Sequence, residues 1–345
     1  WLVMGWFRPF RLNPTPVWRR RLSTRSRSFT LASGSSLTVK IPLEEVRTIT
    51  KRALRCSGLR EDWASTLTNV IAAAERDQSY SHGLFRIPGY CQAIRESGPF
   101  PEPVVTDSGA VVRVDGGGGI AAIAFEAGRE LLVTKAKEYG VATAALSRVR
   151  HFSALWYETE LLSSEHGLVA MAFVNSKAFV AHEGGSKRVY GTNPMSFAFP
   201  RPDGEAPLVW DQASSVMARG EIMLANKAGE MLPPGVAIGP DGKETTDPSQ
   251  ALQGSQKTFA AHKGTAIALM VEMLGGILTS SPLGFELEDA PDTHPTENGE
   301  LIIALDPEKI SGRTLKDIDI RVSQLFDMIL SEEGPRLPGR RRQRS

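Results

Sequence analysis

The run "AVVRVDGGGGIAAIAFEAGRELLVTKAKEYG", residues 110–140, joins a strand pattern, four glycines and a helix pattern. Residues 110–115 read as a β-strand, and residues 125–140 repeat apolar side chains at helical spacing before a terminating glycine. A loose G-x-G-x-x-A pattern lies between them, formed by Gly116, Gly118 and Ala121. Such a pattern can hold a pyrophosphate at a helix N-terminus, so this stretch decides between a Rossmann domain and another α/β architecture.

A Rossmann domain requires an acidic residue that this sequence lacks. Asp or Glu is expected at the end of the next strand, near Ser147, where it would bind a ribose hydroxyl. The sequence has Arg148 and Arg150 there instead. Four consecutive glycines also match the pattern readily by chance, so we favour a tight structural turn over a dinucleotide-binding loop.

The composition is that of a soluble folded protein. The 345 residues include 41% hydrophobic and 23% charged side chains, enough for a large core in one domain or, as we expect, two. The 40 basic and 39 acidic side chains nearly cancel. Nothing therefore attracts the whole chain to nucleic acid or to a membrane surface, and we expect a small-molecule substrate.

Cysteine, histidine and hydropathy patterns exclude several classes of protein. Cys56 and Cys91 cannot form a disulfide framework and fit a reducing, cytoplasmic compartment. Residues 264–280 are apolar but contain Glu272 and a glycine pair, which predicts a buried helix rather than a membrane span. We expect no metal site, because close ligand spacing is missing among His151, His166, His182 and His262.

Residues 1–39 differ from the rest of the chain. They are rich in Arg and Ser, and no acidic residue precedes Glu44. This composition resembles an organelle transit peptide, although a mis-called start or a translated upstream sequence would look the same. We therefore exclude this leader or non-native extension, which we expect to be disordered, from the fold.

Strands and helices alternate in the remaining chain, which predicts a mixed α/β protein. Residues 61–78 form an amphipathic pattern that ends before Ser81. Further strands are expected from near Val141 to Phe152 and at 167–175, 208–213 and 301–306.

Six segments together resemble one family. In chain order they are SHGLFRIPGY (81–90), RHFSALW (150–156), GTNPMSFAFP (191–200), WDQASSVMARGEI (210–222), HKGTAIALMVEML (262–274) and RLPGRRR (336–342). Their order and spacing resemble the malate/L-lactate dehydrogenase-like NAD(P)H-dependent oxidoreductases over about residues 40 to 345. "HFSALW" is most similar to the Δ1-piperideine-2-carboxylate/Δ1-pyrroline-2-carboxylate reductases.

The resemblance implies a non-Rossmann α/β fold. A substrate domain from both chain ends, residues 40–115 and 296–345, would surround an inserted NAD(P)H-binding domain at 116–295. The glycine run would then be a turn leading into the central domain. The resemblance also implies a homodimer with its active site between subunits.

Catalytic roles follow from the same resemblance. His82 titrates near neutrality, so it can give a proton to an imine nitrogen or carbonyl oxygen; without the resemblance it would read as a cap on the preceding helix. Ser81 would orient and polarise His82 together with a carboxylate. That carboxylate would be Glu221, with Asp211 as the competing candidate.

Substrate and cofactor contacts are implied as well. Arg86 would grip a substrate carboxylate with its planar fork, Thr192 would contact substrate, and His182 would face the cleft. The basic tail could bind the 2′-phosphate of NADP. Cofactor contacts are expected from His151, Phe152, Ser153, Ala154, Leu155, Asp211, Gln212, Ala213, His262, Lys263, Arg336, Leu337, Pro338, Gly339, Arg340, Arg341 and Arg342.

The sequence thus predicts an NADPH-dependent reductase of cyclic 2-imino acids, with NADH as the alternative cofactor. Δ1-Piperideine-2-carboxylate would give L-pipecolate and Δ1-pyrroline-2-carboxylate would give L-proline, with His82 as proton donor. Two alternatives stay open. One is an NAD-dependent malate- or lactate-type dehydrogenase of open-chain 2-keto acids, and the other is an inactive relative that serves as a binding protein.

Overall fold

The computed structural model describes residues 41–150, 154–202, 204–287 and 296–340. The expected leader at 1–39 lies outside this part of the chain. None of the described helices is both long and apolar enough to cross a bilayer.

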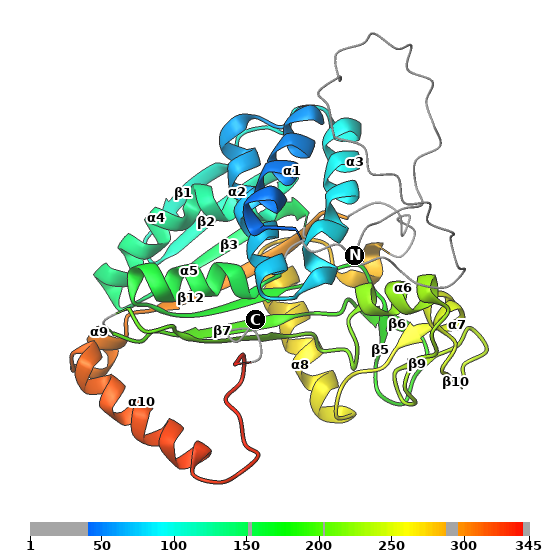
Figure 1. The fold of residues 1–345 in the computed structure, drawn as a ribbon. Helices are drawn as coiled ribbons and strands as arrows, with labels where there is room; N and C mark the ends of the chain where they lie inside the picture. Colours follow the sequence, from blue (N-terminus) through cyan, green and yellow to red (C-terminus); the bar gives the residue numbers. More distant parts are fainter. Residues whose placement is uncertain (1–40, 151–153, 203, 288–295, 341–345) are drawn as a thin grey trace, which may run out of the picture.

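A large mixed sheet organises the molecule (Figure 1). Its spatial order is β1 (Val104–Ser108), β2 (Val111–Ile120), β3 (Val141–Arg150), β12 (Asn298–Leu305), β4 (Val169–Val174), β7 (Met195–Phe199) and β8 (Leu208–Gln212). Strands β2 and β3 pair in parallel, whereas the other pairs in this sheet are antiparallel. A strand from near the end of the chain therefore lies in the middle of the sheet, which is incompatible with the parallel Rossmann order.

A smaller sheet contains the other five strands between β4 and β12 in the chain. Its order is β10 (Glu244–Thr245), β9 (Ala237–Ile238), β11 (Ser255–Gln256), β5 (Val180–Ala181) and β6 (Arg188–Tyr190). Helices α6 (Arg219–Ala228) and α7 (Pro248–Gln253) lie beside it in Figure 1. Helix α8 (His262–Glu272) leads back toward the large sheet and continues into a π-helical turn, Met273–Ile277.

The hydrophobic core follows the alternation of the strands. Helices α4 (Ala121–Tyr139) and α5 (Trp156–His166) pack apolar side chains against β2, β3, β4 and β12. A second cluster joins α1 (Leu43–Cys56), α2 (Glu61–Arg76) and α3 (Ile87–Ser97) to the start of α4. This packing fixes the end of α2, and with it the segment that begins at Ser81.

The glycine run is a bulged strand, so the expected turn is wrong. Strand β2 continues to Ile120, and α4 begins at Ala121. The register of β2 against β3 shifts between Asp115 and Gly119. Gly117 and Gly118 have φ of +58° and +78°, a region that favours glycine. The extra residues bend the strand without ending its pairing.

The expected domain boundary between residues 115 and 116 falls inside β2, and β12 separates two strands of the expected cofactor domain. The described α/β fold is therefore continuous across that boundary through sheet hydrogen bonds. The division into a substrate domain and a cofactor domain stays a prediction.

The apolar segment at 264–280 was expected to be a buried helix, but it is buried only in part. One face of α8 and of the π-helical turn is exposed to solvent. Leu269, Met273 and Ile277 are each about half exposed. They recur every four residues and so form one stripe. Helix α10 (Leu315–Leu330), which follows α9 (Pro307–Ser311), projects from the body in Figure 1 and contains no buried residue.

Candidate active site

Ser81, His82 and Arg86 lie on two consecutive 3-10 turns, Tyr80–His82 and Leu84–Arg86, between α2 and α3. Helix α2 ends at Arg76, and the chain reverses at Gln78, whose φ is +55°. The turns are held locally: His82 N–H donates to Ser79 O at 2.8 Å and Arg86 N–H donates to Gly83 O at 2.9 Å. Two tight turns thus bring a hydroxyl, an imidazole and a guanidinium together.

The imidazole of His82 is oriented by its neighbour. A hydrogen bond of 3.0 Å joins Ser81 Oγ and His82 Nδ1. This leaves Nε2 for proton exchange with a ligand. Burial, reinforced by the positive charge of Arg86, lowers the pKa of His82 to about 3, so the ring is neutral at pH 7 in the free protein.

Arg86 carries a largely buried positive charge. Its Nε donates to the backbone oxygen of Ser81 at 2.6 Å, and burial lowers its pKa. Among the described residues, no carboxylate lies within ion-pair distance of its guanidinium. A buried guanidinium of this kind suits an anionic ligand, because a planar fork can hold both oxygens of a carboxylate.

The segment that was expected to supply a carboxylate reaches this site through a glycine. A Cβ on Gly220 would lie 3.4 Å from both Arg86 Nη2 and the Cβ of Ser81, so the first turn of α6 packs directly on them. The next residue, Glu221, is exposed, and its carboxylate accepts a hydrogen bond of 3.3 Å from Ala218 N–H. Glu221 therefore stabilises the start of its own helix here and does not contact Ser81 or His82.

Thr192 is held in place from both sides. Its backbone oxygen accepts a hydrogen bond of 2.8 Å from Ser214 N–H. The next residue, Asn193, has φ of +40° and donates from Nδ2 to Glu272 Oε2 at 2.7 Å. The loop that carries Thr192 is thus fixed by buried hydrogen bonds.

Glu272 is the centre of this buried network. It is 6% exposed, and besides Asn193 it accepts from Asn175 Nδ2 at 3.2 Å and from Gly284 N–H at 2.6 Å. The carboxylate ties the end of α8 to β4 and to the 191–194 loop. A buried charge satisfied by several donors is a stable structural anchor.

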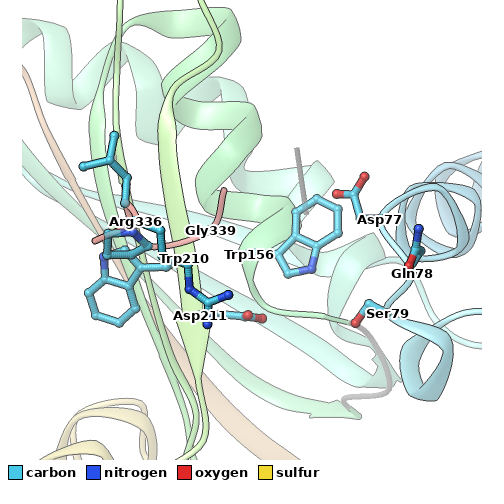
Figure 2. Close-up of a pocket in the computed structure, with 10 residues that line it drawn as sticks. Asp77, Gln78, Ser79, Trp156, Trp210, Asp211, Arg336 and Gly339 are labelled. Carbon is cyan, nitrogen blue, oxygen red and sulfur yellow. The ribbon is translucent and has the colours of Figure 1, made fainter. Parts of the chain in front are cut away.

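A pocket of about 730 Å³ lies beside the 3-10 turns (Figure 2). Figure 2 shows Trp156 on one wall, Trp210 and Asp211 on the facing strand, and Asp77 to Ser79 on the side nearest α2. The remaining wall is the expected tail segment, contributed by Arg336, Leu337, Pro338 and Gly339. Residues far apart in sequence therefore converge on one cavity two residues from Ser81.

The other expected cofactor residues are placed differently. Ala154 and Leu155 are buried in the core, and Gln212 and Ala213 follow Asp211 without lining the pocket. His262 and Lys263 are exposed at the start of α8, and Arg340 follows the lining segment. The residues outside the described chain are His151, Phe152, Ser153, Arg341 and Arg342.

His182 belongs to a second, smaller cavity. That cavity has about 230 Å³ and is also lined by Glu244 and Lys257, which form an ion pair with each other. A hydrogen bond of 2.9 Å joins His182 Nδ1 and the Tyr190 hydroxyl. His182 is not among the residues that line the larger pocket.

Sequence reasoning missed several residues at the site. Trp156 and Trp210 stand inside two of the six recognised segments, and Trp is rare enough here to have drawn attention. Asp77 to Ser79 could have been found from their position just before Ser81. Glu75, whose Oε1 accepts from Leu84 N–H at 2.7 Å, gives no signal in the sequence.

The comparisons with known proteins agree with this architecture. Residues 41–345 match the malate/L-lactate dehydrogenase family. The chain belongs to this family. It is 40% identical to Delta(1)-pyrroline-2-carboxylate reductase 1 of Burkholderia ambifaria, over 90% of this chain and 92% of that protein. It is 41% identical to the Delta(1)-pyrroline-2-carboxylate/Delta(1)-piperideine-2-carboxylate reductase of Pseudomonas aeruginosa, over 88% and 92%.

A solved structure shows the same fold. The delta1-piperideine-2-carboxylate reductase of Pseudomonas syringae superposes with a TM-score of 0.81 at 36% identity, covering 89% of this chain and 92% of that one. The family resemblance read from the six segments and the non-Rossmann α/β fold are confirmed. The chain is an oxidoreductase of this family, and membership implies a nicotinamide cofactor.

Proposed function

We propose that this oxidoreductase reduces cyclic 2-imino acids with NADPH. Δ1-Pyrroline-2-carboxylate would give L-proline, and Δ1-piperideine-2-carboxylate would give L-pipecolate. The relatives with about 40% identity support this substrate class by their names. The observation that carries the proposal is the pairing of an oriented His82 with a buried Arg86 four residues away.

Arg86 would bind the substrate carboxylate, and its charge links that step to proton transfer. In the free protein the positive charge of Arg86 helps to lower the pKa of His82. Burial, the larger cause of the lowered pKa, remains, whereas a substrate carboxylate on Arg86 would offset the charge and shift the pKa of His82 upward, toward the imidazolium that donates from Nε2. Ser81 keeps the ring in one orientation, and the imine nitrogen takes the proton.

The residues of the larger pocket fit a nicotinamide cofactor. Its volume of about 730 Å³ lies within the range of cofactor sites, and Trp210, which is partly exposed, offers a flat apolar wall for a ring. Arg336 provides a positive charge for a phosphate group. When bound, the cofactor supplies hydride to the imine carbon. Trp156, Trp210 and the 336–339 segment would hold it.

Further roles are part of the same proposal. Thr192 would contact substrate from its fixed loop, and His182 would complete the cleft. Glu221, or Asp211 in its place, would support the Ser81–His82 pair, with Glu221 changing its side-chain conformation to do so.

We also propose that the protein forms a homodimer. Exposed apolar side chains on α8 and on α10, where Ile320, Leu325 and Met328 are more than half exposed, support such an interface. A single monomeric species in sedimentation velocity across micromolar concentrations would contradict it.

A matrix of cofactors and substrates tests the function. Purified protein is assayed by absorbance of the reduced cofactor with NADPH or NADH against the two cyclic imino acids, pyruvate and oxaloacetate. We expect the highest kcat/KM with NADPH and a cyclic imino acid, and a large loss in His82→Ala. A preference for the open-chain keto acids would favour a 2-hydroxy acid dehydrogenase. Absence of turnover with every pair would favour an inactive binding protein.

A further inference from the structure

Glu75 lies in the last turn of α2 and reaches the segment that carries the proton donor. Its Oε1 accepts a hydrogen bond of 2.7 Å from Leu84 N–H. Leu84 stands midway in sequence between His82 and Arg86. One side chain of α2 thus fixes the backbone from which both of these side chains project.

The Cα of Gly83 packs closely against the carboxyl group of Glu75. A Cβ at Gly83 would overlap Glu75 Oε1 and would lie 2.7 Å from Cδ and 2.9 Å from Cγ. Gly83 has a negative φ of −91°, so it does not lie in the left-handed region that favours glycine. A side chain at this position would also compete with Glu75 for space.

The location is unfavourable for an acid whose purpose is to stabilise a helix. A carboxylate in the last turn of α2 faces the negative end of the helix dipole. Glu75 is also half-buried, and burial raises its pKa, which shows that the charge is not fully compensated. The hydrogen bond to Leu84 is the contact that offsets these costs.

The other bonds of the segment do not tie it directly to α2. Among the described residues, the remaining hydrogen bonds of residues 80–86 join them to one another, to Ser79 or to the start of α3. The first turn is also linked to α2 through Ser79, whose N–H donates to Ala74 O at 2.8 Å, whereas the second turn, which carries Arg86, has its printed link to α2 through Glu75. The Glu75 contact sets where the second turn lies relative to the pocket edge formed by residues 77–79.

We propose that Glu75 is a positioning residue that places His82 and Arg86 through the backbone of Leu84 and through contact with Gly83. The kinetic part of this inference rests on the proposed function. Glu75 is not among the residues that line the larger pocket.

Glu75→Ala and Glu75→Gln form a matched pair of variants. Glu75→Ala removes the acceptor, and we expect kcat/KM for the imino acid to fall roughly 10- to 100-fold, with kcat decreasing and KM increasing. Glu75→Gln keeps an oxygen of the same reach, and we expect it to retain activity within about 3-fold. NADPH affinity, measured by fluorescence titration, should stay unchanged in both. Equal losses in the two variants, or activity of Glu75→Ala close to wild type, would overturn the proposal.

A double-mutant cycle with Gly83→Ala tests the steric contact. Gly83→Ala alone should lower kcat/KM about as much as Glu75→Ala, because the new methyl group displaces the carboxyl group. In the Glu75→Ala background the same change should cost less than about 2-fold, since the space is vacant. An equal cost of Gly83→Ala in both backgrounds would contradict the contact.

Amide exchange separates this inference from the proposed function. Hydrogen exchange followed by mass spectrometry on peptides containing Leu84 needs no turnover. We expect faster exchange there in Glu75→Ala and wild-type protection in Glu75→Gln. Unchanged protection in Glu75→Ala would refute the structural role. Loss of protection in a protein that is inactive on every imino acid would refute the substrate assignment and leave the positioning contact standing.

Discussion

Two polar clusters in this molecule differ in whether their charged groups have partners within the fold. The carboxylate of Glu272 accepts hydrogen bonds from Asn175, Asn193 and the backbone of Gly284. The segment around His82 and Arg86 instead holds two largely buried basic groups whose pKa values are both lowered, and among the described residues no carboxylate lies within ion-pair distance of either. The carboxylate of the first cluster is satisfied by donors of the fold, whereas the proposed function assigns the counter-charge of the second to a bound substrate.

The difference separates stability from function. A satisfied buried charge contributes to folding, and its removal leaves several donors without partners. An unmatched buried charge costs free energy in the ligand-free protein and is retained because it binds ligand. Substitutions in the two clusters should therefore affect different measurements.

The largest effect is expected on activity when Arg86 is replaced. Arg86→Met keeps much of the side-chain volume but removes the charge, and we expect kcat/KM for the imino acid to fall roughly 1000-fold. The melting temperature should stay the same or rise, because an uncompensated buried charge is gone. Initial rates and thermal unfolding of the same preparation check both parts.

Arg86→Lys is the matched control that separates the effect of the positive charge from the effect of the planar guanidinium shape. Lys keeps the charge but not the planar fork, so we expect an activity between wild type and Arg86→Met. A strong drop in melting temperature for Arg86→Met would show that the guanidinium is a structural group and would remove the proposed contrast.

The complementary substitution replaces Glu272, whose carboxylate has its hydrogen-bond donors within the fold. Glu272→Leu leaves the Asn175 and Asn193 amides without their carboxylate acceptor, and we expect the free energy of unfolding to fall by about 3 kcal/mol. Urea titration measures it. Glu272→Gln keeps one acceptor oxygen and should lose about half as much. If both variants unfold like wild type, Glu272 is not the anchor of the network.

A third buried cluster sharpens the comparison through its pH dependence. Glu158 on α5 and Glu300 on β12 are both buried, and their carboxyl groups influence each other's titration. Burial raises the pKa of Glu158 from 4.5 to about 7 and that of Glu300 well above its ordinary value. The folded state therefore holds protons that the unfolded chain releases above pH 4.5, so this contribution to stability is lost as pH rises through 7.

His82 changes the pH dependence of stability in the opposite direction. Its pKa is lowered from 6.5 to about 3, so the unfolded chain binds a proton that the folded state refuses, and stability falls as pH decreases from 6.5 toward 3. We expect Glu300→Gln to flatten the loss of melting temperature as pH rises above 4.5, and His82→Phe to flatten the loss as pH falls below 6.5. Melting scans between pH 4 and 9 in buffers of equal ionic strength measure both; parallel curves for wild type and either variant would contradict the corresponding assignment.

Local pattern was enough to find part of this site. Ser81, His82 and Arg86 lie within one turn-rich segment, so their proximity follows from sequence separation alone. The strands at β2 and β3 and the helix between them also follow from periodicity and from the terminating Gly140. These features depend on neighbours within a few residues.

Contacts between distant segments could not be read in this way. Gly220, rather than Glu221, meets Arg86 because of the angle at which α6 approaches, and angles between elements have no sequence signature. The bulge in β2 depends on pairing with β3, since an isolated glycine run reads as a turn. The recognised segments predicted that residues 336–339 and Asp211 contact one ligand. They did not predict that Trp156 also lines this pocket, because that depends on how the distant segments pack.

The smallest effect is expected at Arg336, an exposed arginine that contrasts with the buried Arg86. Its charge is screened by water and salt, so Arg336→Ala should raise the KM for NADPH only about 5- to 10-fold and leave that for NADH within about 2-fold. The NADPH effect should shrink when 0.5 M salt is added, roughly as expected for a screened pair. Arg113→Ala, on the exposed face of β2 and away from the pocket, is the control for a general loss of positive charge. An equal rise in KM for both cofactors would show that Arg336 shapes the pocket wall without reading the 2′-phosphate, and NADPH preference would then have to come from another group.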